Sequence, residues 1–260
     1  MAQYPDLNTL KRRFRNMETF GDEGRPLANL SLDVELPAGT KASVYFRDLE
    51  TPLLRHIGDA EAVVGCVAWL TNAAVLQALA RKRTSIVLQK EDFLRPDRGP
   101  LQANWKTERR ALYDAIPPIA MPVNWEAGWM EARDKGDETA TGVPYESLGM
   151  RCIGHEKGPN SAMPRMHHKF LVFLRRLSKS DPRVDCGAWP YKPCAVWTGS
   201  FNITRNGNAS LDNAIYLEAP RLAVAYCREW GQLVHVSESL DWTSHYAEPE
   251  FDFNNGACVS

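Results

Sequence analysis

Two basic side chains near the middle of the sequence are spaced to act on one substrate group. His167 and Lys169 stand two residues apart and are followed by the apolar run FLVFL, which predicts a strand over 166–174. Side chains two apart on a strand project to one face, so the imidazole and the ammonium should point together while His168 points away. A lysine can neutralise phosphate oxygens while a histidine attacks phosphorus, so the pair indicates phosphodiester chemistry through a covalent phosphohistidine.

Small and polar residues follow the next predicted strand. An isolated H-x-K triplet also fits a solvated strand end, so these downstream residues decide between the two interpretations. Gly199, Ser200 and Asn202 close that strand and can hydrogen-bond a phosphate. Asp212 opens the strand after it, where a carboxylate can orient His167 through its second ring nitrogen.

This ordered set resembles the phospholipase D superfamily, particularly its small bacterial nucleases with a single H-x-K motif. The family pattern is H-x-K-x4-D, then G-S-x-N, then an acidic residue that opens the next strand. The residues that match it are His167, Lys169, Gly199, Ser200, Asn202 and Asp212. The resemblance implies an α/β fold in which a mixed β-sheet is flanked by helices on both faces, with an irregular insertion.

The resemblance also implies a role for each matched residue. His167 is the expected nucleophile, and Lys169 and Asn202 are expected to hold the phosphate. Ser200 should assist, and Asp212 should orient His167. The family needs a second histidine to protonate the leaving oxygen. We expect one half-site in this chain, so a two-fold homodimer would bring two copies together without any metal or other cofactor.

Two features depart from the family pattern. The aspartate five residues after the lysine is Leu174 here, and activity remains the expectation because that aspartate is thought to support structure. A basic, proline-containing hairpin over 175–193 separates the two motifs and is expected beside the site. Arg165, Arg175 and Arg176 would then bind substrate near the motif, with a solvated basic face as the alternative.

Cysteine and histidine residues on either side of the predicted H-x-K strand leave a structural zinc site open. Cys152 with His155, and Cys186 with Cys194, would together supply three thiolates and one imidazole. Neither pair has a diagnostic spacing, and small buried cysteines are common. Ordinary packing is therefore the favoured interpretation of these residues.

The remaining sequence predicts alternating strands and helices with one interruption. This alternation favours one α/β layered domain over 41–260, preceded by a polar extension over 1–40 that contains one short helix. Prolines break the alternation over about 91–161, which we interpret as an insertion. The expected strands are 42–46, 60–70, 85–89, 150–153, 166–174, 195–199 and 213–217, and the expected helices are 49–57, 72–82 with Thr71 as its cap, 101–116, 125–134 and 222–233.

The composition of the chain says more about the cellular location of the protein than about its substrate. The chain has 260 residues, a formal net charge of -1 and 44% hydrophobic residues, which is typical of a folded protein without a global basic field. A local basic groove remains compatible with nucleic acid. The polar N-terminus is unlike a secretory signal, no apolar run could span a bilayer, and the six cysteines are scattered, so a cytoplasmic location is expected.

The sequence thus predicts a cytoplasmic, homodimeric, metal-independent nuclease with no membrane partner. DNA is favoured over RNA as its substrate. Two alternatives stay open at this point. One is a phospholipase or phosphatidyltransferase, and the other is an inactive member that binds nucleic acid or a partner protein.

Overall fold

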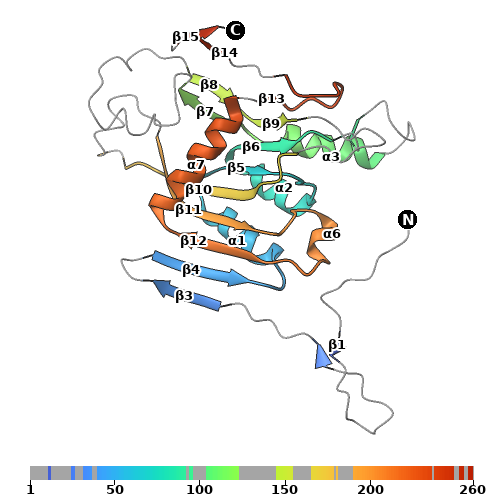
Figure 1. Ribbon diagram of the computed structural model, residues 1–260, viewed down its shortest axis with the longest axis vertical. Helices are drawn as coiled ribbons and strands as arrows, with labels where there is room; N and C mark the ends of the chain where they lie inside the picture. Colours follow the sequence, from blue (N-terminus) through green and yellow to red (C-terminus); the bar gives the residue numbers. More distant parts are fainter. Residues whose placement is uncertain are drawn as a thin grey trace.

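A nine-stranded mixed sheet forms the centre of the protein (Figure 1). The computed structural model describes residues 11–12, 25–26, 32–36, 40–91, 94–95, 104–122, 145–154, 165–178, 180, 190–235, 237–248, 252–254 and 257–259. The strands of the central sheet are β3 (Leu32–Leu36), β4 (Thr40–Tyr45), β5 (Ala62–Val67), β6 (Arg83–Gln89), β9 (Met150–Ile153), β10 (Lys169–Arg176), β11 (Tyr191–Gly199), β12 (Ala214–Glu218) and β13 (Glu238–Ser239).

The strand order is β13-β9-β6-β5-β10-β11-β12-β4-β3. Strands β5, β6 and β9 run parallel to one another, and every other neighbouring pair in this sheet is antiparallel. Three two-stranded sheets lie outside it, formed by β1 (Lys11–Arg12) with β2 (Arg25–Pro26), β7 (Ile119–Pro122) with β8 (Tyr145–Leu148), and β14 (Asp252–Asn254) with β15 (Ala257–Val259).

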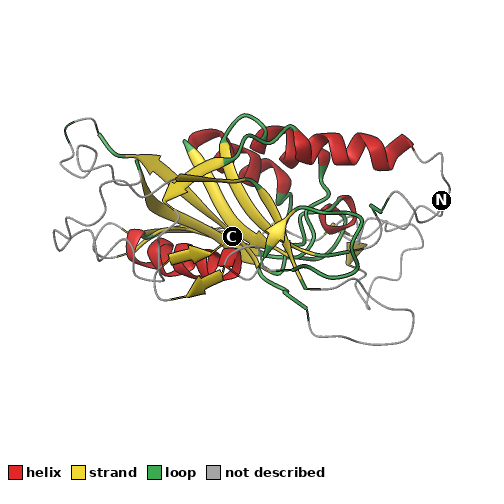
Figure 2. Ribbon diagram, turned by 90° about the horizontal axis from the view of Figure 1, so that it is seen from above, coloured by secondary structure: helices red, strands yellow, loops and turns green. Residues whose placement is uncertain are grey.

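Helices cover both faces of the sheet, as Figure 2 shows from above. The helices are α1 (Glu50–Asp59), α2 (Ala73–Leu79), α3 (Asn104–Asp114), the short α6 (Arg205–Asn208) and α7 (Pro220–His235). Side chains of α1, α2 and α3 join one buried cluster, and side chains of α7 join the cluster on the opposite face. No helix among the described residues is both long enough and apolar enough to cross a membrane.

Strand β5 shows why a central strand can be apolar at every position. Val63 and Val67 pack in the cluster under α1 and α2, while Val64 and Cys66 pack in the cluster under α7. Both faces of the strand are therefore buried, so polar side chains have no place on either one. The expected mixed sheet flanked by helices on both faces is confirmed.

Two sequence expectations differ from the structure. Helix α2 is capped by Asn72 rather than Thr71, because the Asn72 side chain accepts a hydrogen bond from the Val75 backbone N–H at 3.1 Å. Strand β3 pairs with β4, so the central sheet begins inside the segment that we expected to be an extension. The expected helix over 125–134 lies outside the described residues.

Candidate active site at one edge of the sheet

The predicted catalytic residues come from strand ends that meet at one edge of the sheet. Strand β10 begins at Lys169, opposite Val67 at the end of β5. Strand β11 ends at Gly199, opposite Ala214 at the start of β12. Because these antiparallel neighbours reverse direction at the same level, the H-x-K residues, the G-S-x-N loop and Asp212 share this edge. We call it the site edge.

His167 and Lys169 are in direct contact at the site edge. The Lys169 Nζ lies 3.1 Å from each ring nitrogen of His167 and 3.0 Å from the His167 carbonyl oxygen. His168 turns the other way, and its Nε2 lies 3.1 Å from Oε1 of Glu229 on α7. The alternation expected from the sequence therefore separates the two histidines.

The electrostatic surroundings of His167 favour its neutral form. Partial burial lowers the pKa of His167, and the positive charges of Lys169 and Arg165 lower it further. Partial burial also lowers the pKa of Lys169, while the Asp212 carboxylate opposes that change by favouring the ammonium. A neutral imidazole keeps a lone pair free, which is the form that can attack phosphorus.

Ser200 links the end of β11 to Asp212. The Ser200 hydroxyl donates to Oδ1 of Asp212 at 2.7 Å and accepts from the Asn213 backbone N–H at 3.1 Å. At Gly199, a Cβ atom would lie 2.3 Å from the Asn213 carbonyl oxygen, so the close approach of these strand ends requires glycine. Within the described residues Asp212 bonds Ser200 and makes no hydrogen bond to His167.

Asn202 has an unsatisfied acceptor. Its side-chain Oδ1 is buried and has no hydrogen-bond partner among the described residues, whereas its backbone carbonyl accepts from the Thr204 N–H at 2.7 Å. A buried acceptor without a partner is costly to leave unpaired. A hydrogen-bond donor that arrives with a substrate would therefore be stabilised at this position.

The loop that carries Asn202 is held by the loop after β5. The backbone N–H groups of Thr71 and Asn72 both donate to the Ile203 carbonyl, at 2.8 and 3.1 Å. The Glu50 carboxylate accepts from the side-chain amides of Asn72 and Asn208. These contacts fix the position of Asn202 relative to β5.

Two residues of the site edge were not anticipated from the sequence. Trp69 follows β5, and its ring meets the His167 ring edge-on with centroids 5.2 Å apart. The Lys169 Nζ lies 5.8 Å from the centroid of the Trp69 ring. Glu91 follows β6 and accepts from Trp69 Nε1 at 3.0 Å and from Arg165 Nη1 at 2.6 Å. The sequence could have predicted their proximity, because Trp69 and Glu91 each follow a strand, and neighbouring parallel strands end at the same edge of the sheet.

Arg165 lies at the site edge, but Arg175 and Arg176 do not. They lie at the opposite end of β10, about 20 Å along the strand from Lys169 at about 3.3 Å per residue. The expectation that Arg175 and Arg176 lie beside the site was wrong. The strand continues past Leu174 and carries them to the far edge.

Leu174 occupies the position of the missing family aspartate. It is fully buried in the cluster with the α7 side chains. It lies about 17 Å along β10 from Lys169. Leucine at this position therefore belongs to the core and removes no polar group from the site edge.

The sheet separates two of the four candidate zinc ligands. Cys152 lies on β9 and Cys194 on β11, with β6, β5 and β10 between them. Four strand spacings therefore separate the two cysteines, a distance of about 19 Å. One ion cannot bind both thiols, so the four-ligand site was wrong. Burial raises the pKa of Cys152 to about 12, which disfavours the thiolate that a metal needs. His155 and Cys186 lie outside the described residues.

A second H-x-K triplet corrects the expectation of a single one. His155, Glu156 and Lys157 follow β9 directly and lie outside the described residues. This triplet comes after a strand instead of opening one, unlike His167 and Lys169. It is a distinct candidate source of a second histidine.

Comparisons with known proteins give one related sequence and several similar folds. No model of a known protein family matches the chain. A stretch of 201 residues is 29% identical to "Uncharacterized protein L381" of Acanthamoeba polyphaga mimivirus, covering 77% of this chain and 67% of that protein.

Similar solved structures include the phospholipase D family member Nuc from Salmonella typhimurium, with 15% identity and a TM-score of 0.45 over 79% of this chain and 99% of that one. NucT from Helicobacter pylori is 11% identical with a TM-score of 0.44, over 77% and 99% of the two chains. Phosphatidylserine synthase from Haemophilus influenzae is 13% identical with a TM-score of 0.40, over 80% and 41%. Similarity in fold alone does not carry an activity from one protein to another.

Proposed function

We propose that this protein is a phosphodiesterase of the phospholipase D type, and specifically a nuclease that acts through a phosphohistidine. The observation that carries the proposal is the His167–Lys169 pair, with the ammonium 3.1 Å from each ring nitrogen. His167 comes just before β10 and Lys169 begins it, and within the described residues Lys169 forms no ion pair with a carboxylate. A cation next to a neutral imidazole suits the attack on an anionic phosphodiester.

In the first step, the neutral ring of His167 attacks phosphorus and displaces one ester oxygen. A phosphorus–nitrogen bond forms as the phosphorus–oxygen bond breaks, and the leaving oxygen takes a proton from a second, protonated histidine. The Lys169 ammonium balances the charge on the non-bridging oxygens. On the loop after β11, the side-chain amide N–H of Asn202 is the group that can donate to the phosphodiester.

In the second step, water hydrolyses the phosphohistidine. The second histidine, now neutral, takes a proton from the water as its oxygen bonds to phosphorus. The phosphorus–nitrogen bond breaks and returns His167 to its neutral state. All proton transfers are accounted for by two histidines, so the mechanism requires no metal.

We infer that the second histidine is the partner's His167 in a two-fold dimer. Nucleophile and acid must stand on opposite sides of phosphorus, which one ring cannot do. A two-fold interface at the site edge places identical pairs face to face. In that arrangement Asp212 can orient the acid or the nucleophile across the interface, which fits its bond to Ser200 within one chain.

Nucleic acid, with DNA favoured, is the substrate class that the site edge suits. Lys169 provides positive charge beside His167, and Trp69 provides an aromatic ring in the same place. Basic groups combined with aromatic rings are typical of surfaces that bind single nucleic-acid strands.

The proposal is tested with labelled DNA and RNA strands in excess EDTA. The wild-type protein should cut them, and His167→Ala should lower kcat on the order of 10⁴-fold with an unchanged circular dichroism spectrum. His168→Ala is the matched control, because it removes the neighbouring ring that bonds Glu229. It should keep most of the activity.

Quenched reactions should contain protein that carries one of the two cleaved strand fragments on His167 through a phosphorus–nitrogen bond, found by mass spectrometry of peptides. Cleavage of a phospholipid in place of nucleic acid would contradict the nuclease, and binding without turnover would contradict any enzyme. His155→Ala separates the two sources of a second histidine. Loss of activity in that variant, with full activity in a monomer, would overturn the shared site.

A further inference from the structure

Glu91 connects the two groups that flank His167. Its Oε1 accepts from Nε1 of Trp69 at 3.0 Å and from Nη1 of Arg165 at 2.6 Å. Trp69 meets the His167 ring edge-on, and Arg165 contributes to the lowered pKa of His167. A single carboxylate therefore holds a ring on one side of the histidine and a cation on another.

The Glu91–Arg165 pair is protected from solvent. Side-chain exposure is 11% for Glu91 and 20% for Arg165, so water competes weakly for either partner. Exposed pairs fluctuate and contribute little, whereas a shielded pair with short contacts keeps its geometry. The contact can therefore fix where the guanidinium and the indole stand.

The chain that leads into His167 is attached to the end of β6 at two successive residues. The Met166 backbone N–H donates to Oε1 of Gln89 at 2.9 Å, and Arg165 bonds Glu91. The segment just before Lys169 is not part of a strand. These contacts replace strand pairing for the residues that precede His167.

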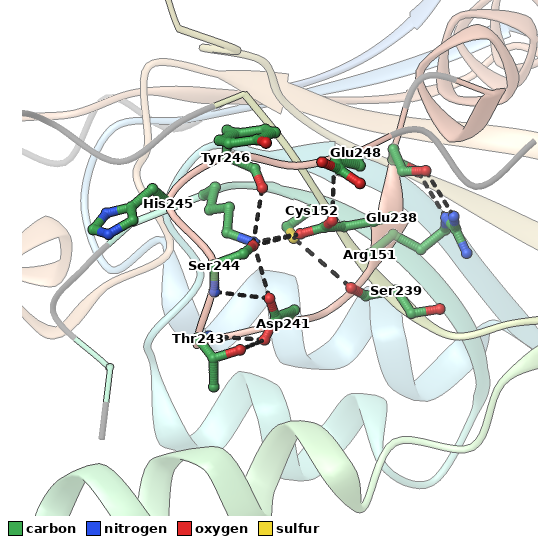
Figure 3. Close-up of polar contacts among 12 residues, drawn as sticks. Arg151, Cys152, Glu238, Ser239, Asp241, Thr243, Ser244, His245, Tyr246 and Glu248 are labelled. Carbon is green, nitrogen blue, oxygen red and sulfur yellow. Dashed lines mark hydrogen bonds and ion pairs between the residues drawn. The ribbon is translucent and has the colours of Figure 1, made fainter. Parts of the chain in front are cut away.

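The residue between those two attachment points is itself anchored. Lys90 is buried, and its ammonium bonds the carboxylate of Glu238 and the hydroxyl of Ser244. Figure 3 shows this cluster, with the side chains of Glu238, Asp241 and Ser244 directed to one centre. The backbone from which Glu91 extends is therefore fixed on its other side.

We propose that Glu91 is a positioning residue for the reaction, which acts on His167 through Trp69 and Arg165. A role in catalysis rests on the proposed function, whereas the effect of Glu91 on the pKa and position of His167 does not depend on turnover. The indole limits the rotation of the imidazole, and the carboxylate offsets the guanidinium charge. Among the described residues, the charged and titratable groups around His167 are Lys169, Arg165, His168, Glu91 and, before β12, Asp212.

The decisive variant is Glu91→Gln, which keeps the size and one acceptor oxygen but removes the charge. Without the carboxylate, Arg165 stands as an uncompensated cation and disfavours the imidazolium. We expect the pKa of His167 to fall below its wild-type value, measured by NMR on histidines labelled at Cε1. The His167 signal is assigned by its loss in His167→Ala.

Glu229→Gln is the matched control. It removes one negative charge beside His168. If the loss of any nearby negative charge were enough to lower the pKa of His167, this variant would lower it as well. The His167 titration should be unchanged in this control. In the double variant Glu91→Gln with Arg165→Gln, the pKa of His167 should return towards the wild-type value, because the uncompensated cation is gone.

Turnover provides a second readout. Glu91→Gln should lower kcat on the order of tenfold to a hundredfold with little change in KM, because misplacement of the nucleophile affects the chemical step. The acid limb of the pH profile should move to lower pH together with the pKa of His167. Trp69→Phe keeps a ring but removes the indole N–H, and it should lower kcat without moving the limb.

The outcomes separate this inference from the proposed function. An unchanged His167 titration and unchanged kcat in folded Glu91→Gln would overturn the role of Glu91. Absence of cleavage by wild-type protein would overturn the proposed function while the NMR titration still decides on Glu91. If Glu91→Gln does not fold, the titration of Arg165→Gln decides. Removing the guanidinium should raise the pKa of His167, and an unchanged pKa overturns the inference.

Discussion

Two lysines lie at the site edge and have opposite surroundings. Lys90 follows β6 directly and Lys169 opens β10, with only β5 between these strands. Lys90 is 3% exposed and forms ion pairs with the carboxylates of Glu238 and Asp241. Lys169 is partly exposed, and its ammonium lies against the ring nitrogens and carbonyl of His167 and near the Trp69 ring.

The comparison shows how partners decide what a cation can do. A buried ammonium between carboxylates has its charge satisfied, so it holds structure and has nothing to offer an incoming anion. An ammonium beside a neutral imidazole keeps its charge for a phosphate. The residue type and the edge of the sheet are the same, but the burial of the lysine and the chemistry of its neighbours differ.

The largest effect is expected from Lys90→Met. The substitution leaves the Glu238 carboxylate buried without its cation, so the free energy of unfolding should fall by about 3–5 kcal/mol. Urea denaturation followed by circular dichroism measures this change. Adding Glu238→Gln should recover part of the loss, and a stability unchanged from wild type would contradict the structural role of Lys90.

Lys169→Met should lower activity and leave stability nearly unchanged. We expect kcat to fall by about 10²–10³-fold, in the range for removal of one charge-stabilising donor. The midpoint in urea should stay near that of wild type because the side chain is partly exposed. Comparable activity of Lys169→Met and wild type on labelled DNA would count against the phosphate-binding role.

The same pair of variants should differ in the titration of His167. The Lys169 ammonium lowers the pKa of His167, so Lys169→Met should raise that pKa towards the ordinary value of about 6.5. At a given pH just below the ordinary value, a larger fraction of His167 would then be protonated and unable to attack. Lys90→Met, studied at a temperature where it is folded, should change the pKa of His167 less than Lys169→Met does, because Lys90 acts on His167 only through the backbone of Glu91.

The smallest effect is expected at the far end of β10. Arg175→Gln and Arg176→Gln change charge about 20 Å from Lys169 along the strand, beyond the screening length of about 8 Å at physiological salt. Values of kcat and KM should stay within about twofold of wild type. A large rise in KM would show that substrate reaches the hairpin end of the sheet.

The fold was predictable where local pattern and burial agree. The apolar run in β5 and the strand–helix alternation up to Gln89 predicted elements close to those observed, because strands buried on both faces leave a clear signal. Helix α7 begins at Pro220, two residues before the helix expected over 222–233, because proline fits the first turn of a helix. The end of β10 was misjudged, because Arg175 and Arg176 continue a strand that hydrophobicity alone suggested had stopped.

The candidate site was predictable in its motif residues and not in their supports. His167, Lys169 and Asp212 are marked by order and spacing, which a sequence displays directly. Trp69 and Glu91 are brought to His167 by the pairing of β10 with β5 and by the parallel neighbour β6. Such contacts depend on strand order across the sheet, and strand order is a property of the whole fold.

The order of strands also has a consequence for how activity is acquired during folding. The site edge combines the start of β10 with the end of β5, which the chain joins only after closing a long loop. Loop closure carries an entropy cost that must be met before the paired strands stabilise each other. Trp69 and Glu91 reach His167 only after β5, β6 and β10 have paired. We therefore expect activity to appear only when the central sheet is complete.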